Sequence, residues 1–247
     1  MCSSDLEEFF GKSTGIYKKL RYGENPHQQA IFKGDLNKIF EQLHGKELSY
    51  NNLLDINAAV KLISEFKETT FAILKHNNAC GIASSSDLSS SYSKAFDADP
   101  LSAFGGVLIS NKTLDVESAK KINNLFFEII ISPKYDKDAL DILTSNKNRV
   151  ILLQKKNIFQ EYISRDILNG VIKQQSDNLT TRHSSWESVT EKKCSTSQLE
   201  DLEFANKVVK HSKSNAIVLV KNKQMLSSGV GQDRKSTRLN SSHQIIS

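Results

Sequence analysis

Short runs of apolar residues alternate along the chain with stretches in which apolar residues recur every three or four positions. The first pattern is typical of buried strands, and the second is typical of helices that bury one face. Apolar runs predict strands at 71–74, 107–109, 128–131, 150–153 and 215–220. Amphipathic stretches predict helices at 56–66, 88–96, 114–127, 138–143 and 198–211. Strands that alternate with helices indicate an α/β architecture.

Turn and capping residues predict where several of these elements begin and end. Asp55 and Asp87 each precede an amphipathic stretch, so both are predicted helix N-caps. The segment 77–81 follows the strand 71–74 and contains Asn and Gly, which predicts a tight loop. Residues 174–197 are rich in Ser, Thr, Lys, Glu and Gln, which predicts a long surface connection that Trp186 pins to the body.

Composition describes an ordinary globular protein. The 247 residues carry 33 Lys and Arg against 28 Asp and Glu, a net charge of +5 that suits a phosphate-bearing substrate without requiring nucleic acid. No run of 18 apolar residues occurs, which argues against a membrane span. Three scattered cysteines argue against a disulfide scaffold and favour a reducing compartment such as the cytosol.

The pair Lys75–His76 is the strongest candidate for chemistry, because it directly follows a predicted buried strand. An imidazole can accept a proton near neutral pH, and a neighbouring ammonium can stabilise negative charge on the group under attack. Strand ends also carry Lys and His simply because the chain leaves the core there. His76 and Cys80 have a spacing that could suggest zinc, but the Cys-x-x-Cys and His-x-Glu partners of a zinc deaminase do not accompany them.

A second candidate segment is the loop RYGENPHQ at 21–28. Gly23 and the Asn25–Pro26 pair make it a turn-rich loop and not a helix. Arg21 offers a planar fork that suits phosphate, and Tyr22 adds a hydroxyl and a flat stacking face. A solvated turn would carry the same residues, so the loop alone leaves both interpretations open.

Taken together, six ordered blocks resemble one enzyme family. They are RYGENPHQ (21–28), GKELSYNNLLD (45–55), ILKHNNACG (73–81), DPLSAFGG (99–106), EIIISPKY (128–135) and DLEFANKVVKHSKSNAIV (201–218), which runs on to GVGQ (229–232). The chain is similar over about 18–232 to the formyltransferase half of the bifunctional AICAR formyltransferase/IMP cyclohydrolase family. AICAR is aminoimidazole carboxamide ribotide, called the ribotide below.

The resemblance implies a fold and a division of the chain. The family has three-layer α/β lobes related to the cytidine-deaminase architecture, each with a mixed sheet flanked by helices. We therefore expect a first lobe at 18–175, a connection at 176–197 and the start of a second lobe at 198–232. Residues 1–17 match the family poorly, and residues 233–247 read as a non-native tail.

The resemblance also implies an activity. In the family, a formyl group moves from 10-formyltetrahydrofolate to the 5-amino group of the ribotide in purine biosynthesis, with no metal required for the chemistry. His76 matches the general base, and Lys75 matches the group that stabilises negative charge on the formyl oxygen. A positioned general base typically contributes about 10²–10⁴-fold in rate.

Five further residues match positions that bind substrate in the family. Arg21 and Tyr22 match a nucleotide-binding pair, and Gly105 matches a glycine whose backbone lies against the substrate. Glu128 occupies an acidic substrate-binding position, and Asn215 matches an asparagine that contacts substrate.

The sequence departs from the family at several points. Ala79 stands where many members have proline, and Lys235 stands where the family has arginine. The segments that complete the folate pocket do not occur in these residues. The family pocket forms across a homodimer interface, so a second copy is an expected partner of the intact protein.

Two alternatives remain open from the sequence. A truncated, catalytically inactive nucleotide-binding module of the same family would keep the same binding residues. A basic nucleic-acid binder rests on charge alone and lacks a stripe of aromatic and basic residues, so no nucleic-acid partner is expected.

Overall fold

The computed structural model describes residues 16–157 and 160–231, and its centre is one mixed sheet of eight strands. Its order is β11-β12-β5-β4-β6-β7-β8-β3. The strands are β3 (Phe40–His44), β4 (Thr70–Lys75), β5 (Asn78–Ser84), β6 (Gly106–Ser110), β7 (Phe127–Ser132), β8 (Val150–Gln154), β11 (Ile217–Lys221) and β12 (Gln224–Gly229). Strands β6, β7 and β8 are parallel to one another, whereas β4 is antiparallel to β6. The predicted α/β class with a mixed sheet is confirmed.

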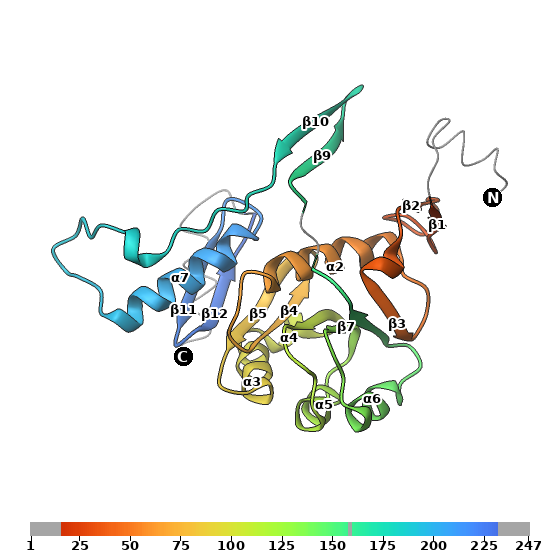
Figure 1. Cartoon of the computed structure of the whole chain (residues 1–247), viewed down its shortest axis with the longest axis horizontal. Coiled ribbons are helices and arrows are strands. Elements are labelled where there is room, and N and C mark those ends of the chain that lie inside the picture. The colour runs from red at the N-terminus through yellow and green to blue at the C-terminus, as the bar shows by residue number, and fades with distance from the viewer. Residues whose placement is uncertain (1–15, 158–159, 232–247) are drawn as a thin grey trace.

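Helices flank the sheet (Figure 1). They are α2 (Tyr50–Ile63), α3 (Leu88–Ala98), α4 (Pro100–Ala103), α5 (Val116–Ile122), α6 (Lys137–Thr144) and α7 (Thr196–Lys210). One buried cluster joins α2 and α7 to one face of the sheet, and a second joins α3, α5 and α6 to the other face. The two clusters give the body three layers, helix on sheet on helix.

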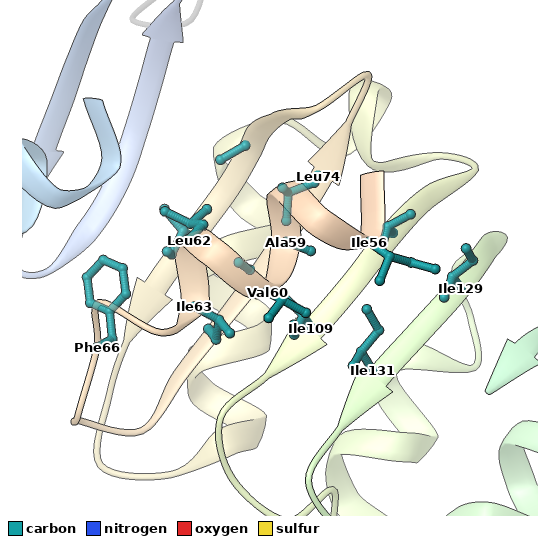
Figure 2. Close-up of a cluster of buried hydrophobic side chains, with 14 of the residues drawn as sticks. Ile56, Ala59, Val60, Leu62, Ile63, Phe66, Leu74, Ile109, Ile129 and Ile131 are labelled. Carbon is teal, nitrogen blue, oxygen red and sulfur yellow. The ribbon is translucent and has the colours of Figure 1, made fainter. Parts of the chain in front are cut away.

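The cluster under α2 shows how sequence pattern becomes packing (Figure 2). Ile56, Ala59 and Ile63 recur at helical spacing and point toward the sheet. Ile109 and Ile131, from neighbouring parallel strands, meet them from below. Each of these five side chains is at least 97% buried, and burying one large aliphatic side chain contributes about 1.5–3 kcal/mol. This packing fixes α2 across the sheet.

Helix α2 begins earlier than predicted. Its N-cap is Ser49, whose hydroxyl accepts from the Asn52 backbone N–H while the Asn52 amide oxygen accepts from the Ser49 N–H. The prediction that Asp55 caps this helix is wrong, because the buried apolar pattern starts one turn inside it. Asp87 does cap α3 as predicted, accepting from the Ser90 N–H.

Two other predicted boundaries are wrong for tertiary reasons. The predicted loop 77–81 is mostly strand β5, which pairs with β4 through a two-residue turn at His76 and Asn77. The predicted helix 114–127 ends at Ile122, and Phe127 already belongs to β7. The Arg149 guanidinium donates to the carbonyls of Asn123 and Leu125, which satisfies backbone groups just past the helix end.

A hairpin and a connection lie outside the body. Strands β9 (Tyr162–Ile167) and β10 (Gly170–Gln175) form a separate two-stranded sheet that the sequence pattern did not predict and that projects from the body (Figure 1). The predicted connection 174–197 holds the end of β10, a 3-10 turn η2 (His183–Ser185) and the start of α7. Trp186 lines a hollow together with α7 residues, and its predicted pinning role stays a prediction.

The segment predicted to start a second lobe extends the same sheet. Strand β12 pairs with β5 at Gln224 and Ala83, and the Ser84 N–H donates to the Lys223 carbonyl. Phe204 of α7 packs 4.9 Å from Phe66, centroid to centroid. Residues 198–231 therefore share a core with the first predicted lobe, and the division into two lobes stays a prediction.

Two small elements precede the body. Strands β1 (Tyr17–Lys19) and β2 (Ile31–Lys33) form a two-stranded sheet around the loop that holds Arg21, and a 3-10 turn η1 (Leu36–Lys38) follows. The predicted tail at 233–247, Gln232 and residues 1–15 lie outside the described residues. No helix among the described residues is long and apolar enough to cross a membrane.

Candidate active site

A cleft of about 450 Å³ opens at the amino ends of β6 and β7, beside the turn between β4 and β5. Six of the seven predicted site residues line it: Arg21, Tyr22, Lys75, His76, Gly105 and Glu128. The remaining lining residues are Glu24, Lys46, Ser49, Asn51, Asn52, Leu54, Asp55 and Asn77. Segments far apart in the sequence therefore meet at one cavity of a size typical for small-molecule sites.

The turn that carries His76 has an unusual backbone. His76 and Asn77 both adopt left-handed conformations, with φ of 51° and 65°. Two successive left-handed residues match the type I′ turn that suits the twist of a β-hairpin, and Asn tolerates this region better than most residues. The turn holds the His76 side chain at the cleft, exposed to solvent.

Asp55 fixes this turn from helix α2. Its Oδ1 accepts a hydrogen bond from the Asn77 backbone N–H at 2.7 Å. Burial raises the pKa of Asp55 above its ordinary value, although the Asn77 hydrogen bond and the charges of His76 and Lys75 oppose the rise. The partly desolvated Asp55 carboxylate thus ties helix α2 to the hairpin formed by β4 and β5.

The Lys75 ammonium is held at a defined place by two backbone carbonyls. It donates to Phe104 O at 3.1 Å and to Gly105 O at 2.8 Å. Gly105 has a φ of +68°, and a Cβ there would lie 2.9 Å from the Lys75 nitrogen. The left-handed backbone therefore favours glycine at position 105, and any side chain there would displace the Lys75 ammonium.

Arg21 and Tyr22 line the cleft from the loop between β1 and β2. The Arg21 guanidinium donates to the Tyr22 hydroxyl at 2.9 Å and lies 4.7 Å from the centre of the Tyr22 ring. Their loop is tied to α2, because the Tyr50 N–H donates to Tyr22 O and the Asn51 side chain donates to Glu24 O. The exposed guanidinium keeps donors for an anion.

Glu128 enters the cleft from the start of β7. Its Oε2 accepts from the Asn52 side chain at 3.1 Å. Asn52 is itself part of the capping box that begins α2. The helix start thus positions the carboxylate of Glu128 within the cleft.

Asn215 is the predicted site residue that the structure does not bring into this cleft. It lies in the segment before β11, and the neighbouring Lys213 N–H donates to the Asn78 side chain at 3.1 Å. The segment therefore reaches the start of β5, close to the turn in sequence, without lining the cavity.

Sequence reasoning missed the contributions of Asn51, Asn52 and Asp55. All three lie in the block GKELSYNNLLD, which carried the family resemblance but from which no site residue was taken. A signal was present, because three polar side chains interrupt the start of an amphipathic helix. Only the position of α2 over the sheet shows that they face the cleft.

Cys80 is a packing residue near the site. Its thiol donates to the Ile73 carbonyl, and burial followed by the charge of Asp99 raises its pKa to about 12. Such a thiol stays protonated near neutral pH. Within the described ranges, no three His, Cys, Asp or Glu side chains form a group that could hold a metal ion.

Comparison with known proteins identifies the family of this chain. The profile of the AICARFT/IMPCHase bienzyme family matches residues 4–245. The bifunctional purine biosynthesis protein PurH of Bacteroides thetaiotaomicron is 54% identical over 223 residues, covering 90% of this chain and 44% of that protein. The PurH proteins of Persephonella marina and Petrotoga mobilis are each 44% identical, covering 86% and 94% of this chain and 43% and 46% of theirs.

The chain spans less than half the length of these relatives. The match to the family profile nevertheless extends over nearly all of it. The chain belongs to the AICARFT/IMPCHase bienzyme family.

Proposed function

We propose that this cleft is the formyl-transfer site of an AICAR formyltransferase. The supporting observation is that Lys75 and His76 border the same cavity as Arg21, Tyr22 and Glu128. On this proposal, a small molecule bound in the cleft contacts a proton acceptor, a cation and a phosphate-binding group. The proposed reaction moves a formyl group from 10-formyltetrahydrofolate to the 5-amino group of the ribotide.

The chemistry assigns a separate step to each of the two central side chains. The ribotide amine attacks the formyl carbon, and His76 takes the proton that the amine nitrogen loses. Lys75 stabilises the negative charge that develops on the formyl oxygen; removing one such donor typically costs about 10²–10³ in rate. The bond between the formyl carbon and N10 of the folate then breaks, and N10 takes a proton.

The remaining residues orient the ribotide. Arg21 suits the phosphate because its planar fork matches phosphate oxygens, and Lys46 adds a second positive charge to the cleft. Glu128 can accept from hydroxyl or amide donors of the ligand. Gly105 lets the ligand approach the backbone. Asn215 would join this set only if the segment before β11 moves toward the cleft.

An aromatic pair next to the cleft suits the folate. The rings of Phe104 and Phe126 lie 4.8 Å apart, beside Gly105, and are 62% and 45% exposed. Exposed aromatic faces bind flat conjugated rings by stacking. We place the folate on this side of Lys75. In the intact protein we expect a homodimer and a cytosolic location.

The decisive experiment compares ribotide binding and formyl transfer in the protein and in His76→Ala. We expect His76→Ala to lose roughly 100-fold or more in turnover while its affinity for the ribotide changes little. The matched control is His183→Ala. This variant removes an imidazole that is hydrogen-bonded to Glu203 and does not line the cleft. Equal turnover in His76→Ala and wild type would contradict the assignment.

The inactive-module alternative has its own signature. It predicts that the chain binds the ribotide, that Arg21→Ala weakens this binding, and that no formyl transfer occurs in wild type. Failure of the ribotide to bind at all would contradict both functions.

A further inference from the structure

A second cavity, of about 430 Å³, lies at the opposite edge of the sheet from the candidate active site. It is bordered by the carboxyl ends of the parallel strands β6, β7 and β8, whereas the catalytic cleft lies at their amino ends. The carboxyl edge of parallel strands is where open α/β sheets commonly bind ligands. We refer to this cavity as the lysine cleft.

The lysine cleft is strongly positive. Its lining includes Lys67, Lys112, Lys155 and Lys156, and no carboxylate. Among the described residues, Lys67, Lys112 and Lys156 have no ion-pair partner, and Lys155 lies 3.5 Å from Glu41. Several like charges around one hollow repel one another, so a bound anion would relieve that repulsion.

Nearby acidic residues do not neutralise this charge. Glu65 is engaged by Lys210 at 2.8 Å and by His211 at 2.9 Å. Glu68 lies 3.9 Å from Lys223. Glu41 pairs with Lys155 of the lysine cleft, whereas Glu65 and Glu68 are already paired with cations outside it.

Hydrogen bonds fix the backbone on both sides of the rim. The Lys112 carbonyl accepts from the buried hydroxyls of Ser110 and Ser132, at 2.8 and 2.9 Å. The Asn111 side chain donates to the carbonyls of Phe66 and Glu68, which flank Lys67. A rim whose backbone is already fixed loses little further backbone entropy when a ligand binds.

The third part of the rim is fixed in the same way. The Gln154 amide donates to the Lys156 carbonyl at 3.3 Å, and the Lys155 N–H donates to Ile39 O at 2.7 Å. Ile63 and Phe66 supply an apolar floor. A positive rim over an apolar floor suits a small molecule that carries phosphate groups on an organic body.

We infer that the lysine cleft is a second ligand site, separate from the formyl-transfer cleft, that binds a small phosphorylated anion with two or more phosphate groups. A ligand with two or more phosphate groups suits this cleft because Lys67, Lys112 and Lys156 lie on three separate segments, after α2, β6 and β8. The inference does not rest on the proposed function, since none of its residues lines the candidate active site.

The test uses inorganic pyrophosphate as the probe, with binding measured by calorimetry at constant ionic strength. The cleft variant is Lys112→Gln with Lys156→Gln. We expect this variant to bind pyrophosphate about tenfold or more weakly, because two charge contacts are lost. The matched control, Lys147→Gln with Lys193→Gln, removes the same charge from exposed lysines elsewhere and should bind within about twofold of wild type.

A third variant separates the two clefts. Arg21→Ala removes an anion-binding group of the catalytic cleft and should leave pyrophosphate binding to the lysine cleft unchanged. Loss of binding only in Arg21→Ala would overturn the inference, because the anion would then occupy the other cleft. Equal weakening in the cleft and control double variants, or no binding of millimolar pyrophosphate to wild type, would also overturn it.

Discussion

At the scale of single residues, the candidate site depends on one hydrogen bond between elements. His76 and Asn77 occupy backbone conformations that cost of order 1–3 kcal/mol each outside glycine, unless surrounding contacts compensate. The Asp55 carboxylate supplies such a contact through the Asn77 N–H. The position of the proposed base is therefore set by a side chain that does no chemistry itself.

Two variants of Asp55 separate its hydrogen bond from its charge. Asp55→Asn keeps an Oδ1 acceptor for the Asn77 N–H but removes the charge, whereas Asp55→Ala removes both. A raised folded-state pKa means that this group favours folding most at low pH and less as pH rises through that value. Near neutral pH we therefore expect Asp55→Asn to be as stable as wild type.

The alanine variant should behave differently. Loss of the acceptor leaves the Asn77 N–H without its partner, so Asp55→Ala should be less stable than Asp55→Asn by about 1–2 kcal/mol and should turn over more slowly. Urea denaturation of both variants measures the first effect. Equal stability of the two variants would show that the hydrogen bond does not hold the turn.

Gly105 gives a second test at the same scale. Gly105→Ala forces an alanine into a left-handed backbone and places a methyl group 2.9 Å from the Lys75 ammonium. We expect a loss of at least about 1 kcal/mol in the free energy of unfolding, together with slower formyl transfer. Gly170→Ala is the matched control, because a Cβ there meets nothing within 4 Å. Equal stability of Gly105→Ala and wild type would contradict the backbone strain expected at this position.

At the scale of elements, the first two turns of α2 act as a platform, meaning that they hold side chains in fixed positions at the cleft. The helix begins with the Ser49 capping box, continues through Asn52 and reaches Asp55 one turn later. The far half of the same helix is anchored in the core by Ile56, Ala59 and Ile63 (Figure 2). Core packing of the far half of α2 thus fixes the positions of Asn52 and Asp55 near its start.

A comparison of two helix caps tests this idea. Ser49 caps α2 and Ser195 caps α7, and each belongs to a capping box. Replacing either by alanine should cost about 1 kcal/mol in folding stability. Only Ser49→Ala should also weaken ribotide binding, since Asn52 and Glu128 then lose their fixed geometry. Equal ribotide affinity in both variants would contradict the platform role of α2.

At the scale of the whole molecule, a cluster of charges joins α7 to the body. Glu65, just beyond α2, accepts from Lys210 at 2.8 Å and from His211 at 2.9 Å at the end of α7. Burial raises the pKa of Glu65, but hydrogen bonds from His211 and Lys210 outweigh it and hold the value at about 2. This cluster couples the end of α7 to the end of α2.

The cluster predicts an acid-sensitive fold. A folded-state pKa below the usual 4.5 means that Glu65 stabilises the fold above that pH and loses its effect as pH falls from about 4.5 to about 2. The contribution is up to about 3 kcal/mol. Glu65→Gln should lower the unfolding midpoint near neutral pH and flatten its decline in acid.

Glu117→Gln is the control for this prediction, because Glu117 is exposed and lies 3.8 Å from Lys121. Thermal unfolding followed across the acid range compares the two variants. An unchanged pH dependence in Glu65→Gln would show that another group controls acid unfolding.

The local pattern correctly predicts the elements whose residues are buried on all sides or repeat with a clear period. The isoleucine runs of β7, the amphipathic α6 and the Asp87 cap of α3 belong to this group, because local pattern and burial agree there. The sequence motifs also identify the family, and six of the seven site residues predicted from them line the cleft. The resemblance identifies these residues but does not give their positions in space.

The remaining boundaries and side-chain positions depend on contacts between segments that lie far apart in the sequence. The start of α2 follows from a cap outside the apolar pattern, and the end of α5 follows from Arg149, which lies on a later loop. Asn52 and Asp55 line the cleft, whereas Asn215 does not, because of how α2 and β11 are positioned in the fold. The local sequence does not encode these positions, since each is fixed by hydrogen bonds and packing from other elements.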